Sequence, residues 1–306
     1  MNNYLKRWLR SDWLLIAIPG AIWGASFLFM AEALASVGPS GVTFIRVLFG
    51  FLTLSAFPAV RRAVPARDNA AIALLGVLWM AFPLSMFPVA EQSVSSAVTG
   101  MLNGAIPLVA TIVASVLARR WPARQVLVGL AVGVLGAALI AWPSLDEGGN
   151  SANGILLIMA ALVSYGFAIN IARPLQQRHG SLPVIWRALG VALVLTAPLG
   201  IPDVVNADWK LIPVLSLLAL GAFGTGVAYV IAATASGRLG ATRASTIAFL
   251  IPPVALLLGV VLRNEQVSLI SAAGCAVCVL GAWLISRPVA GRMKEKQKAA
   301  AQLRTA

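Results

Sequence analysis

One sequence pattern occurs twice in this chain, about half a chain apart. Residues 90–142 align without a gap on residues 235–287, and this alignment places Pro107 on Pro252. Shorter matches precede it in each half. They are Trp23-Gly24 with Tyr165-Gly166, and Ile45-Arg46 with Trp186-Arg187. A repeat of this length predicts two structurally similar halves.

Composition places both halves in a membrane. Of the 306 residues 59% are hydrophobic and only 11% are charged, and the mean hydropathy is +0.89. A soluble domain carries about a quarter charged residues. The apolar runs approach the ~20 residues that an α-helix needs to cross a bilayer, and they are too long for barrel strands. We therefore predict an all-α polytopic membrane protein.

Ten membrane spans can be assigned. We expect them at residues 13–36, 40–60, 69–90, 94–118, 124–143, 152–175, 181–201, 209–235, 240–262 and 267–286. The first span has a basic start like a signal peptide but a longer apolar region, so we expect a retained helix. Residues 1–147 and 148–290 then hold five spans each, followed by a basic cytoplasmic tail at 291–306. Five is odd, so the second half must be inverted, an arrangement typical of transporters.

Basic residues fall on alternate connections. Nineteen of the 23 Lys and Arg residues lie on the side of the N-terminus, and only Lys210 and Arg263 lie between spans on the other side. The positive-inside rule therefore predicts that both termini are cytoplasmic. The net charge of +13 is spread over short segments next to the spans. This pattern favours membrane lipids, and not nucleic acid, as partners of these charges.

Short motifs carry a resemblance to a known family. They are Ile22-Trp23-Gly24-Ala25-Ser26-Phe27, Phe44-Ile45-Arg46, Ala244-Ser245, Phe249-Leu250-Ile251-Pro252-Pro253 and Asn264-Glu265. In this order, over nearly the whole chain, they resemble the EamA-type exporters of the drug/metabolite transporter superfamily. Within it the chain is similar to bacterial exporters of amino acids, including aromatic ones. The resemblance implies export of small metabolites across a bacterial-type inner (plasma) membrane. One position departs from the family pattern, because Arg120 stands where an acid often follows the fourth span.

Aromatic and neutral polar side chains are the candidates for contact with a solute. Trp23 and Phe27 share a face of the first span, and Trp79, Phe82 and Met86 are expected to do so in the third. The candidate set is Trp23, Phe27, Trp79, Met86, Thr99, Asn103, Tyr165, Asn170, Tyr229, Ser245 and Phe249. Amides can donate and accept, and aromatic rings can cover an ammonium group, which suits a zwitterionic solute. The alternative is that these side chains face lipid or pack between helices.

Three ionisable residues fall inside the spans: Glu32, Arg46 and Arg187. A charged side chain deep in a membrane costs free energy, so ionisable residues there often line the path of a solute. The two arginines occupy matching places in the halves, however, and we favour snorkelling or a brace at a helix end for both. Glu32 lies near the outer end of its span and is the only acidic candidate for proton coupling. Its peripheral place favours uniport, driven by the gradient of the solute.

Proline and small residues indicate bends and close packing. Pro107 and Pro252 each remove a backbone hydrogen bond at matching places, so we expect both to be hinges. The patterns Gly129-x-x-x-Gly133 and Gly274-x-x-x-Cys278 predict close helix contact, within the halves or in a homodimer. The protein is thus expected to be a monomer or a homodimer.

No catalytic or metal-binding pattern stands out. Cys275 and Cys278 have C-x-x-C spacing but lie in an apolar span, and the single histidine, His179, lies in a turn. We expect no metal, no cofactor and no enzymatic activity. The expected function is secondary transport, with export of small amphipathic solutes, above all amino acids, by alternating access. The alternatives are proton-coupled efflux of drugs or other metabolites, a channel, and a non-transporting membrane protein.

Overall fold

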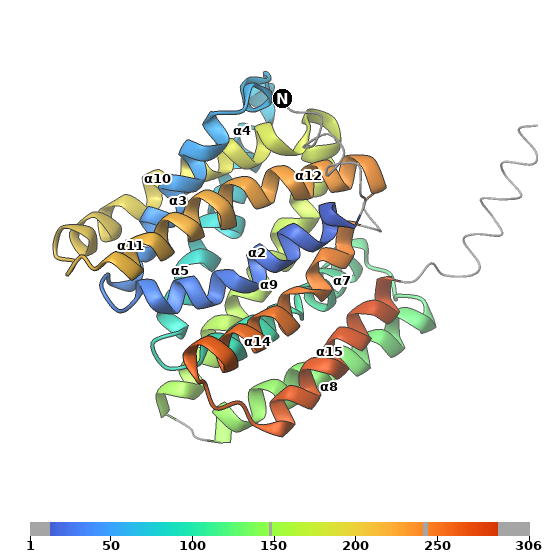
Figure 1. The fold of residues 1–306 in the computed structure, drawn as a ribbon. Coiled ribbons are helices and arrows are strands. Elements are labelled where there is room, and N and C mark those ends of the chain that lie inside the picture. The colour runs from blue at the N-terminus through green and yellow to red at the C-terminus, as the bar shows by residue number, and fades with distance from the viewer. Residues whose placement is uncertain (1–12, 147–148, 241–243, 287–306) are drawn as a thin grey trace, which may run out of the picture.

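The computed structural model describes residues 13–146, 149–240 and 244–286. Within these residues every regular element is a helix, which confirms the all-α fold (Figure 1). The basic tail and the predicted boundary between the halves, at 147 and 148, lie outside the described residues.

The first half contains five helical spans. Their elements are α2 (Leu14–Ala33), α3 (Pro39–Ser55), η1 (Pro58–Arg61), η2 (Ala66–Asp68), α4 (Asn69–Leu75), η3 (Gly76–Ala81), α5 (Phe82–Ala90), α6 (Ser96–Asn103), α7 (Ile106–Ala118) and α8 (Arg124–Asp146). The second span, expected to reach residue 60, ends at Ser55. Pro58 follows and starts the 3-10 helix η1, because proline cannot continue the α-helical hydrogen bonds.

The second half contains the other five spans. Its elements are α9 (Gly149–His179), α10 (Ser181–Val205), α11 (Leu211–Leu218), η4 (Ala219–Val227), α12 (Ala228–Leu239), η5 (Ser245–Phe249), α14 (Ile251–Arg263) and α15 (Leu269–Ser286). In the described chain nine helical segments are long and apolar enough to cross a membrane, and α3 is a shorter apolar helix. The ten-span architecture is therefore confirmed.

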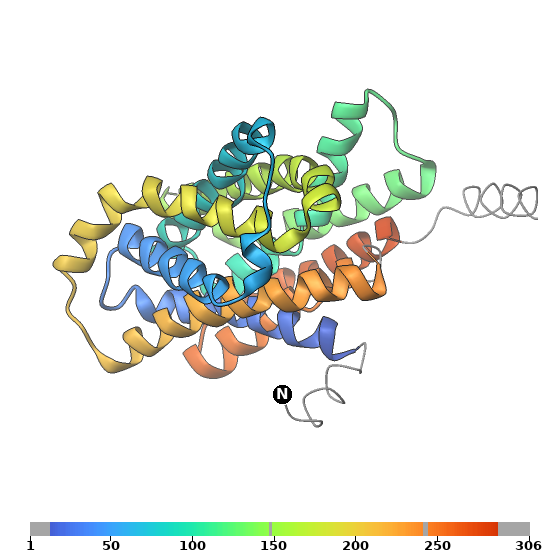
Figure 2. The same ribbon diagram turned by 90° about the horizontal axis from the view of Figure 1, so that it is seen from above.

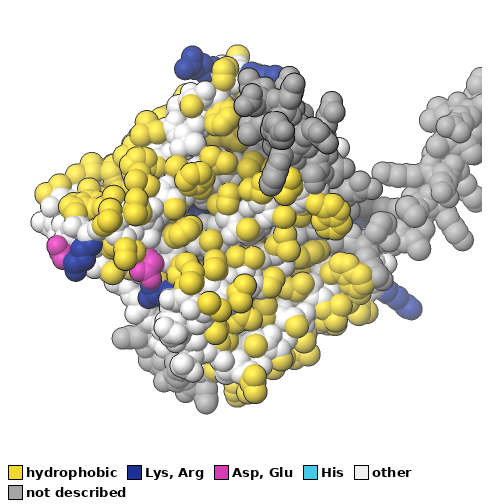
Figure 3. All heavy atoms as spheres, in the orientation of Figure 1, with side chains coloured by type: hydrophobic (Ala, Val, Ile, Leu, Met, Phe, Trp, Pro, Cys, Tyr) yellow, Lys and Arg dark blue, Asp and Glu magenta, His cyan; other side chains and the backbone are white. Residues whose placement is uncertain are grey.

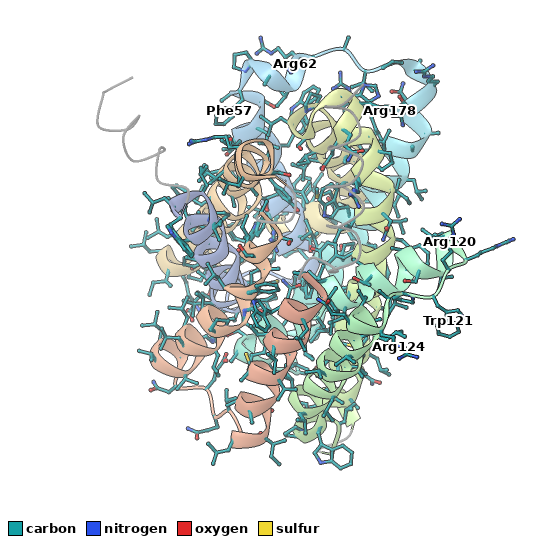
Figure 4. All side chains as sticks on the ribbon, turned by 90° about the vertical axis from the view of Figure 1, so that its right-hand side faces the viewer. Phe57, Arg62, Arg120, Trp121, Arg124 and Arg178 are labelled. Carbon is teal, nitrogen blue, oxygen red and sulfur yellow. The ribbon has the colours of Figure 1, made fainter. Side chains whose placement is uncertain are left out.

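The turns between spans gather at two opposite ends of the bundle. In Figure 2 the α10–α11 turn lies at one end and the α7–α8 turn at the other. One end, the acidic end, carries Glu32, Glu91, Asp203, Asp208, Arg263 and Glu265. The other, the basic end, includes Arg62 and Arg178 at the top of Figure 4, and Arg120, Trp121 and Arg124 projecting from the α7–α8 turn. Between the ends, hydrophobic side chains cover much of the visible face (Figure 3).

The third span of each half contains a π-helical segment, η3 in the first half and η4 in the second. Such segments are rare and are frequent at functional sites. The glycines of η4 bring it close to α3. A Cβ added at Gly221 would lie 2.5 Å from the Cβ of Phe49, and one added at Gly226 would lie 2.5 Å from Thr53 Cγ2.

The fourth span of each half is broken. The helix stops at Asn103 and restarts at Ile106, with Pro107 in the first turn of α7. In the second half the 3-10 helix η5 leads into α14, where Pro252 occupies the same place. Proline is tolerated there because first-turn N–H groups lack intrahelical partners. The two breaks meet, since a Cβ added at Gly104 would lie 2.5 Å from Pro252 Cγ.

Helices α8 and α15, the fifth spans of the two halves, pack side by side (Figure 1). A Cβ added at Gly136 would lie 2.2 Å from the backbone N of Cys278, and one at Gly281 would lie 2.3 Å from the N of Gly133. Close helix contact at these small residues is therefore confirmed. It joins the two halves, which corrects the expectation of contact within a half, because inversion places the two equivalent spans next to each other.

Candidate solute site between the halves

The first ring triad consists of Trp23, Trp79 and Tyr229. Trp23 lies on α2 and Trp79 on η3 of the first half, and Tyr229 lies on α12 of the second half. The Tyr229 ring lies edge-on to both indoles, with centroid distances of 5.5 Å to Trp23 and 5.9 Å to Trp79. The indole N–H of Trp23 donates to the carbonyl of Gly224 over 2.9 Å. This bond orients Trp23 on η4, so the π-helical backbone of one half positions a ring of the other.

Phe27, Phe87 and Tyr165 form a second ring triad across the same interface. The Phe27 and Phe87 centroids lie 5.8 Å apart, and those of Phe87 and Tyr165 lie 6.0 Å apart. Phe27 and Phe87 are almost fully buried, whereas the Tyr165 side chain retains a little exposure. The candidate residues Trp23, Phe27, Trp79, Tyr165 and Tyr229 thus come together between the halves. Phe87 was missed, although it is the neighbour of Met86.

Arg46 is a buried arginine that lies near one tyrosine of each triad, Tyr165 and Tyr229. It is 9% exposed and its Nε donates to the hydroxyl oxygen of Thr225 over 3.0 Å. The prediction of snorkelling is wrong for this residue: the guanidinium points inward because η4 offers it the Thr225 hydroxyl.

Two candidates on α6, Thr99 and Asn103, differ in their hydrogen bonding. Thr99 is fully buried and its hydroxyl donates to Ser95 O of its own helix over 3.0 Å. Asn103 is 8% exposed, and its Oδ1 is buried without a hydrogen-bond partner in the described chain. Because a buried polar atom without a partner costs free energy, Asn103 is the stronger candidate for accepting a hydrogen bond from a solute.

The remaining candidates lie around this centre. Asn170 Nδ2 donates to Ala110 O and Gly166 O over 3.0 and 2.8 Å, which ties α9 to α7. Met86 and Phe249 are partly buried and pack against the central apolar core. Ser245 is exposed at the start of η5. Their contact with a solute stays a prediction.

Phe82 does not share the face of Trp79 and Met86, contrary to the expectation from their spacing. It is 39% exposed, whereas Trp79 and Met86 pack against the core. Residues 76–81 form the π-helical η3, whose wider turn changes the angle between successive residues. Counting by three and four residues therefore fails at this point of the span.

The acidic end is held together by a charge network between the halves. Arg263 pairs with Glu32 and donates through Nε to Glu265 Oε1 over 3.2 Å. Glu265 in turn accepts hydrogen bonds from the first turn of α6, from the N–H of Ser96 at 3.1 Å and of Ala97 at 2.8 Å. A carboxylate at a helix N-terminus satisfies orphan N–H groups and the helix dipole. Glu32 is therefore an ion-pair partner of Arg263.

Glu91 is the acid that sequence reasoning missed. The residue is only partly buried, but both carboxylate oxygens are shielded and have no hydrogen-bond partner in the described chain. Burial raises the pKa of the Glu91 carboxyl well above its ordinary value, and the neighbouring Glu265 raises it further. Arg263 and Arg46 oppose this shift. Its place after the third span gave no sign of this burial.

The basic end has its own links between the halves. His179 Nε2 lies 2.7 Å from Asp68 Oδ2, and Arg178 Nη1 lies 3.4 Å from Asp68 Oδ1. Arg187 donates to the carbonyls of Val60 and Arg62 over 3.3 and 2.9 Å. Arg187 is therefore a brace at a helix end, as predicted.

Comparison with known proteins agrees with this architecture. The sequence profile of the EamA-like transporter family matches residues 11–142 and again residues 152–287. The chain belongs to the EamA-like transporter family. The two matches coincide with the two five-span halves, so one family unit occurs twice in this EamA-like transporter.

Several relatives of this EamA-like transporter span nearly the same length. A probable terminal-alkyne amino-acid exporter of Streptantibioticus cattleyicolor is 27% identical, over 94% of this chain and 96% of the relative. The uncharacterized inner membrane transporter YedA of Escherichia coli K12 is 27% identical over 87% of each chain. The uncharacterized transporter YdfC of Bacillus subtilis is 26% identical over 85% of this chain and 86% of its own. The chain is thus a multi-span membrane protein of a family of bacterial inner-membrane transporters.

A solved crystal structure shares the fold. It superposes with a TM-score of 0.57 at 18% sequence identity, covering 90% of this chain and 96% of the other. This similarity concerns the path of the backbone alone.

Proposed function

We propose that this transporter exports amino acids, aromatic or large neutral ones first, by alternating access and without a coupling ion. The observation that carries the proposal is the pair of ring triads, which bring five of the candidate residues together between two inverted halves. Aromatic rings bind an apolar side chain by contact and an ammonium group by cation–π attraction. A relative with 27% identity is named a probable terminal-alkyne amino-acid exporter, and this supports the same substrate class.

The alternating movement is proposed to use the two helix breaks. Pro107 and Pro252 stand just after them, and Gly104 contacts Pro252 where the breaks meet. Separation of the halves at the acidic end requires the Glu265–α6 and Arg263–Glu32 contacts to open. Separation at the basic end requires the Asp68–His179 contact to open. The predicted topology makes the acidic end external and the basic end cytoplasmic.

Counterflow in proteoliposomes tests the proposal. Vesicles are loaded with unlabelled phenylalanine, leucine or another amino acid, with no ion gradient, and uptake of the labelled amino acid is followed. We expect saturable exchange of the large neutral and aromatic amino acids, competed by unlabelled ones. The same exchange is expected after Glu32→Gln, because a uniporter needs no titrating group there. Absence of exchange across the panel, with folded protein, would reject amino acids as the substrates.

Proton-coupled efflux of drugs or other metabolites is the second candidate function, and Glu91 is the observation that favours it. A shielded carboxylate whose pKa is raised above the ordinary glutamate value is a candidate for taking up and releasing a proton during transport. In this case an imposed pH gradient should drive solute accumulation, and Glu91→Gln should abolish the accumulation while leaving counterflow. A gradient without effect on accumulation would leave uniport.

A further inference from the structure

We propose that Arg46 is the anchor for a carboxylate group of the transported solute. The inference rests on the proposed transport function and defines its substrate class: solutes that carry a carboxylate next to an apolar or aromatic group. It goes beyond the ring triads, which recognise apolar and cationic groups but give no reason for an anion to bind.

The guanidinium of Arg46 is buried and only partly satisfied. It is 9% exposed, and Nε makes the one hydrogen bond found for this side chain in the described residues, to Thr225 Oγ1 at 3.0 Å. The π-helical η4 packs closely against α3 at this point, since a Cβ added at Gly221 would lie 3.1 Å from Arg46 O. The Nε bond fixes the plane of the guanidinium and leaves both Nη groups without a hydrogen bond to any described residue.

Among the described residues no acid lies within ion-pair distance of Arg46, and Glu32 and Glu265 both pair with Arg263. The titratable groups near Arg46 are Tyr165, Tyr229 and Glu91, and of these Glu91 is the acid, although it lies beyond ion-pair distance. Burying a charge without an ion-pair partner is energetically unfavourable. An anion from outside the protein would remove this cost.

The matching arginine of the other half shows the contrast. Arg187 occupies the position equivalent to Arg46 in the repeat, yet its Nη groups donate to the carbonyls of Pro183, Val60 and Arg62. The Arg187 side chain also lies 5.7 Å from the centre of the Trp186 ring. Arg187 is thus satisfied by backbone carbonyls, whereas the Nη groups of Arg46 have no hydrogen-bond partner in the part of the chain that the structure describes.

The surroundings select the rest of the solute. The planar fork of a guanidinium matches the two oxygens of a carboxylate, which a lysine cannot reproduce. Thr225, which accepts from Arg46, follows Gly224, whose carbonyl accepts from the Trp23 indole, so a carboxylate held by Arg46 would lie close to the first ring triad. Free amino acids and other aromatic or aliphatic acids fit this description, while their amides and esters lack the anion.

Binding of matched acids and amides tests the anchor. Thermal stabilisation of the purified full-length protein gives the Kd for phenylalanine and phenylalaninamide, and for phenylacetate and phenylacetamide. We expect wild type to bind each acid roughly 10- to 100-fold more tightly than its amide, as for one charge-assisted bidentate contact. Arg46→Gln should weaken acid binding by about that factor and leave amide binding within about threefold, so that the ratio falls to near one. Arg46→Lys should keep part of the preference.

Arg187→Gln is the matched control, and it should leave the acid-to-amide ratio at the wild-type value. Equal binding of acids and amides by wild type would overturn the anchor while leaving counterflow of amino acids, and hence the proposed function, intact. An unchanged ratio in Arg46→Gln would do the same. If wild type neither binds any acid nor exchanges any amino acid, both proposals fall. Should Arg46→Gln not fold, the wild-type ratio and Arg46→Lys still decide.

Discussion

Ser96 and Glu265 belong to different halves, yet the Ser96 hydroxyl donates to Glu265 Oε1 over 2.7 Å. The same oxygen accepts the Ser96 N–H, and Oε2 accepts the Ala97 N–H over 2.8 Å. One side chain after α14 therefore closes the N-terminus of α6. In the repeat Glu265 corresponds to Arg120, which is exposed at the basic end, so the two copies have diverged in charge according to the end they occupy.

Replacing Glu265 by Ala should destabilise the protein. The substitution leaves two first-turn N–H groups and one hydroxyl without their acceptor, and we expect a loss of about 1–3 kcal/mol, with Glu265→Gln losing less. Thermal unfolding in detergent measures the loss. Asp208→Ala is the control, because Asp208 is 77% exposed and pairs with the exposed Lys210, and it should change stability by no more than about 0.5 kcal/mol. Equal effects of the two substitutions would contradict the capping role.

Gly136→Ala should disrupt the contact between α8 and α15. The new Cβ would lie 2.2 Å from the Cys278 N, and backbone at this distance cannot move aside without separating the helices. Overpacking of this kind costs roughly 1–3 kcal/mol. Gly237→Ala provides the comparison, since nothing lies within 4 Å of a Cβ at Gly237. Unfolding temperatures of the two variants measure the difference, and a stable Gly136→Ala protein would speak against the close contact.

Tyr229 offers a test of the first ring triad. Tyr229→Phe keeps both edge-on contacts with Trp23 and Trp79, so affinity for an aromatic amino acid should change by no more than about threefold. Tyr229→Ala removes both contacts and should weaken binding by about tenfold or more. Concentration dependence of counterflow gives both values. If Tyr229→Ala exchanged aromatic amino acids like wild type, the triad would be packing alone.

Glu91 should make stability depend on pH. Its pKa in the folded protein lies above that of a free glutamate, because burial, and then Glu265, disfavour the charged form. The folded state therefore binds the proton more tightly than the unfolded state, and stability falls as pH rises from about 4.3, the ordinary value, through the folded pKa. Melting temperatures between pH 5 and 9 should decline in wild type and decline less in Glu91→Gln. Parallel curves for the two proteins would show that the pKa of Glu91 is not raised in the folded protein.

Much of the architecture could be predicted from the sequence, because hydropathy and charge act locally. The length of each apolar run decides that a helix crosses the membrane, and the ten spans follow from it. The repeat places Pro107 and Pro252 at equivalent sites, and both stand at helix breaks. Five of the eleven candidate residues meet in the ring triads, and helical spacing accounts for one part of this: Trp23 and Phe27 share a face of the first span and each enters a triad.

Other features depend on contacts between segments far apart in the chain, and the sequence alone could not reveal them. The π-helical turns of η3 and η4 break the spacing rule at Phe82 and bring Gly224 O and Thr225 to Trp23 and Arg46. The two matching arginines look equivalent in the repeat, but Arg187 is braced by carbonyls, whereas Arg46 makes a single side-chain hydrogen bond within the described chain. Likewise Glu91 resembles any acid after a span until neighbouring helices shield it. Hydropathy thus determined which segments enter the membrane, whereas the packing of the two halves decided which buried polar groups find hydrogen-bond partners, because those partners come from segments far apart in the chain.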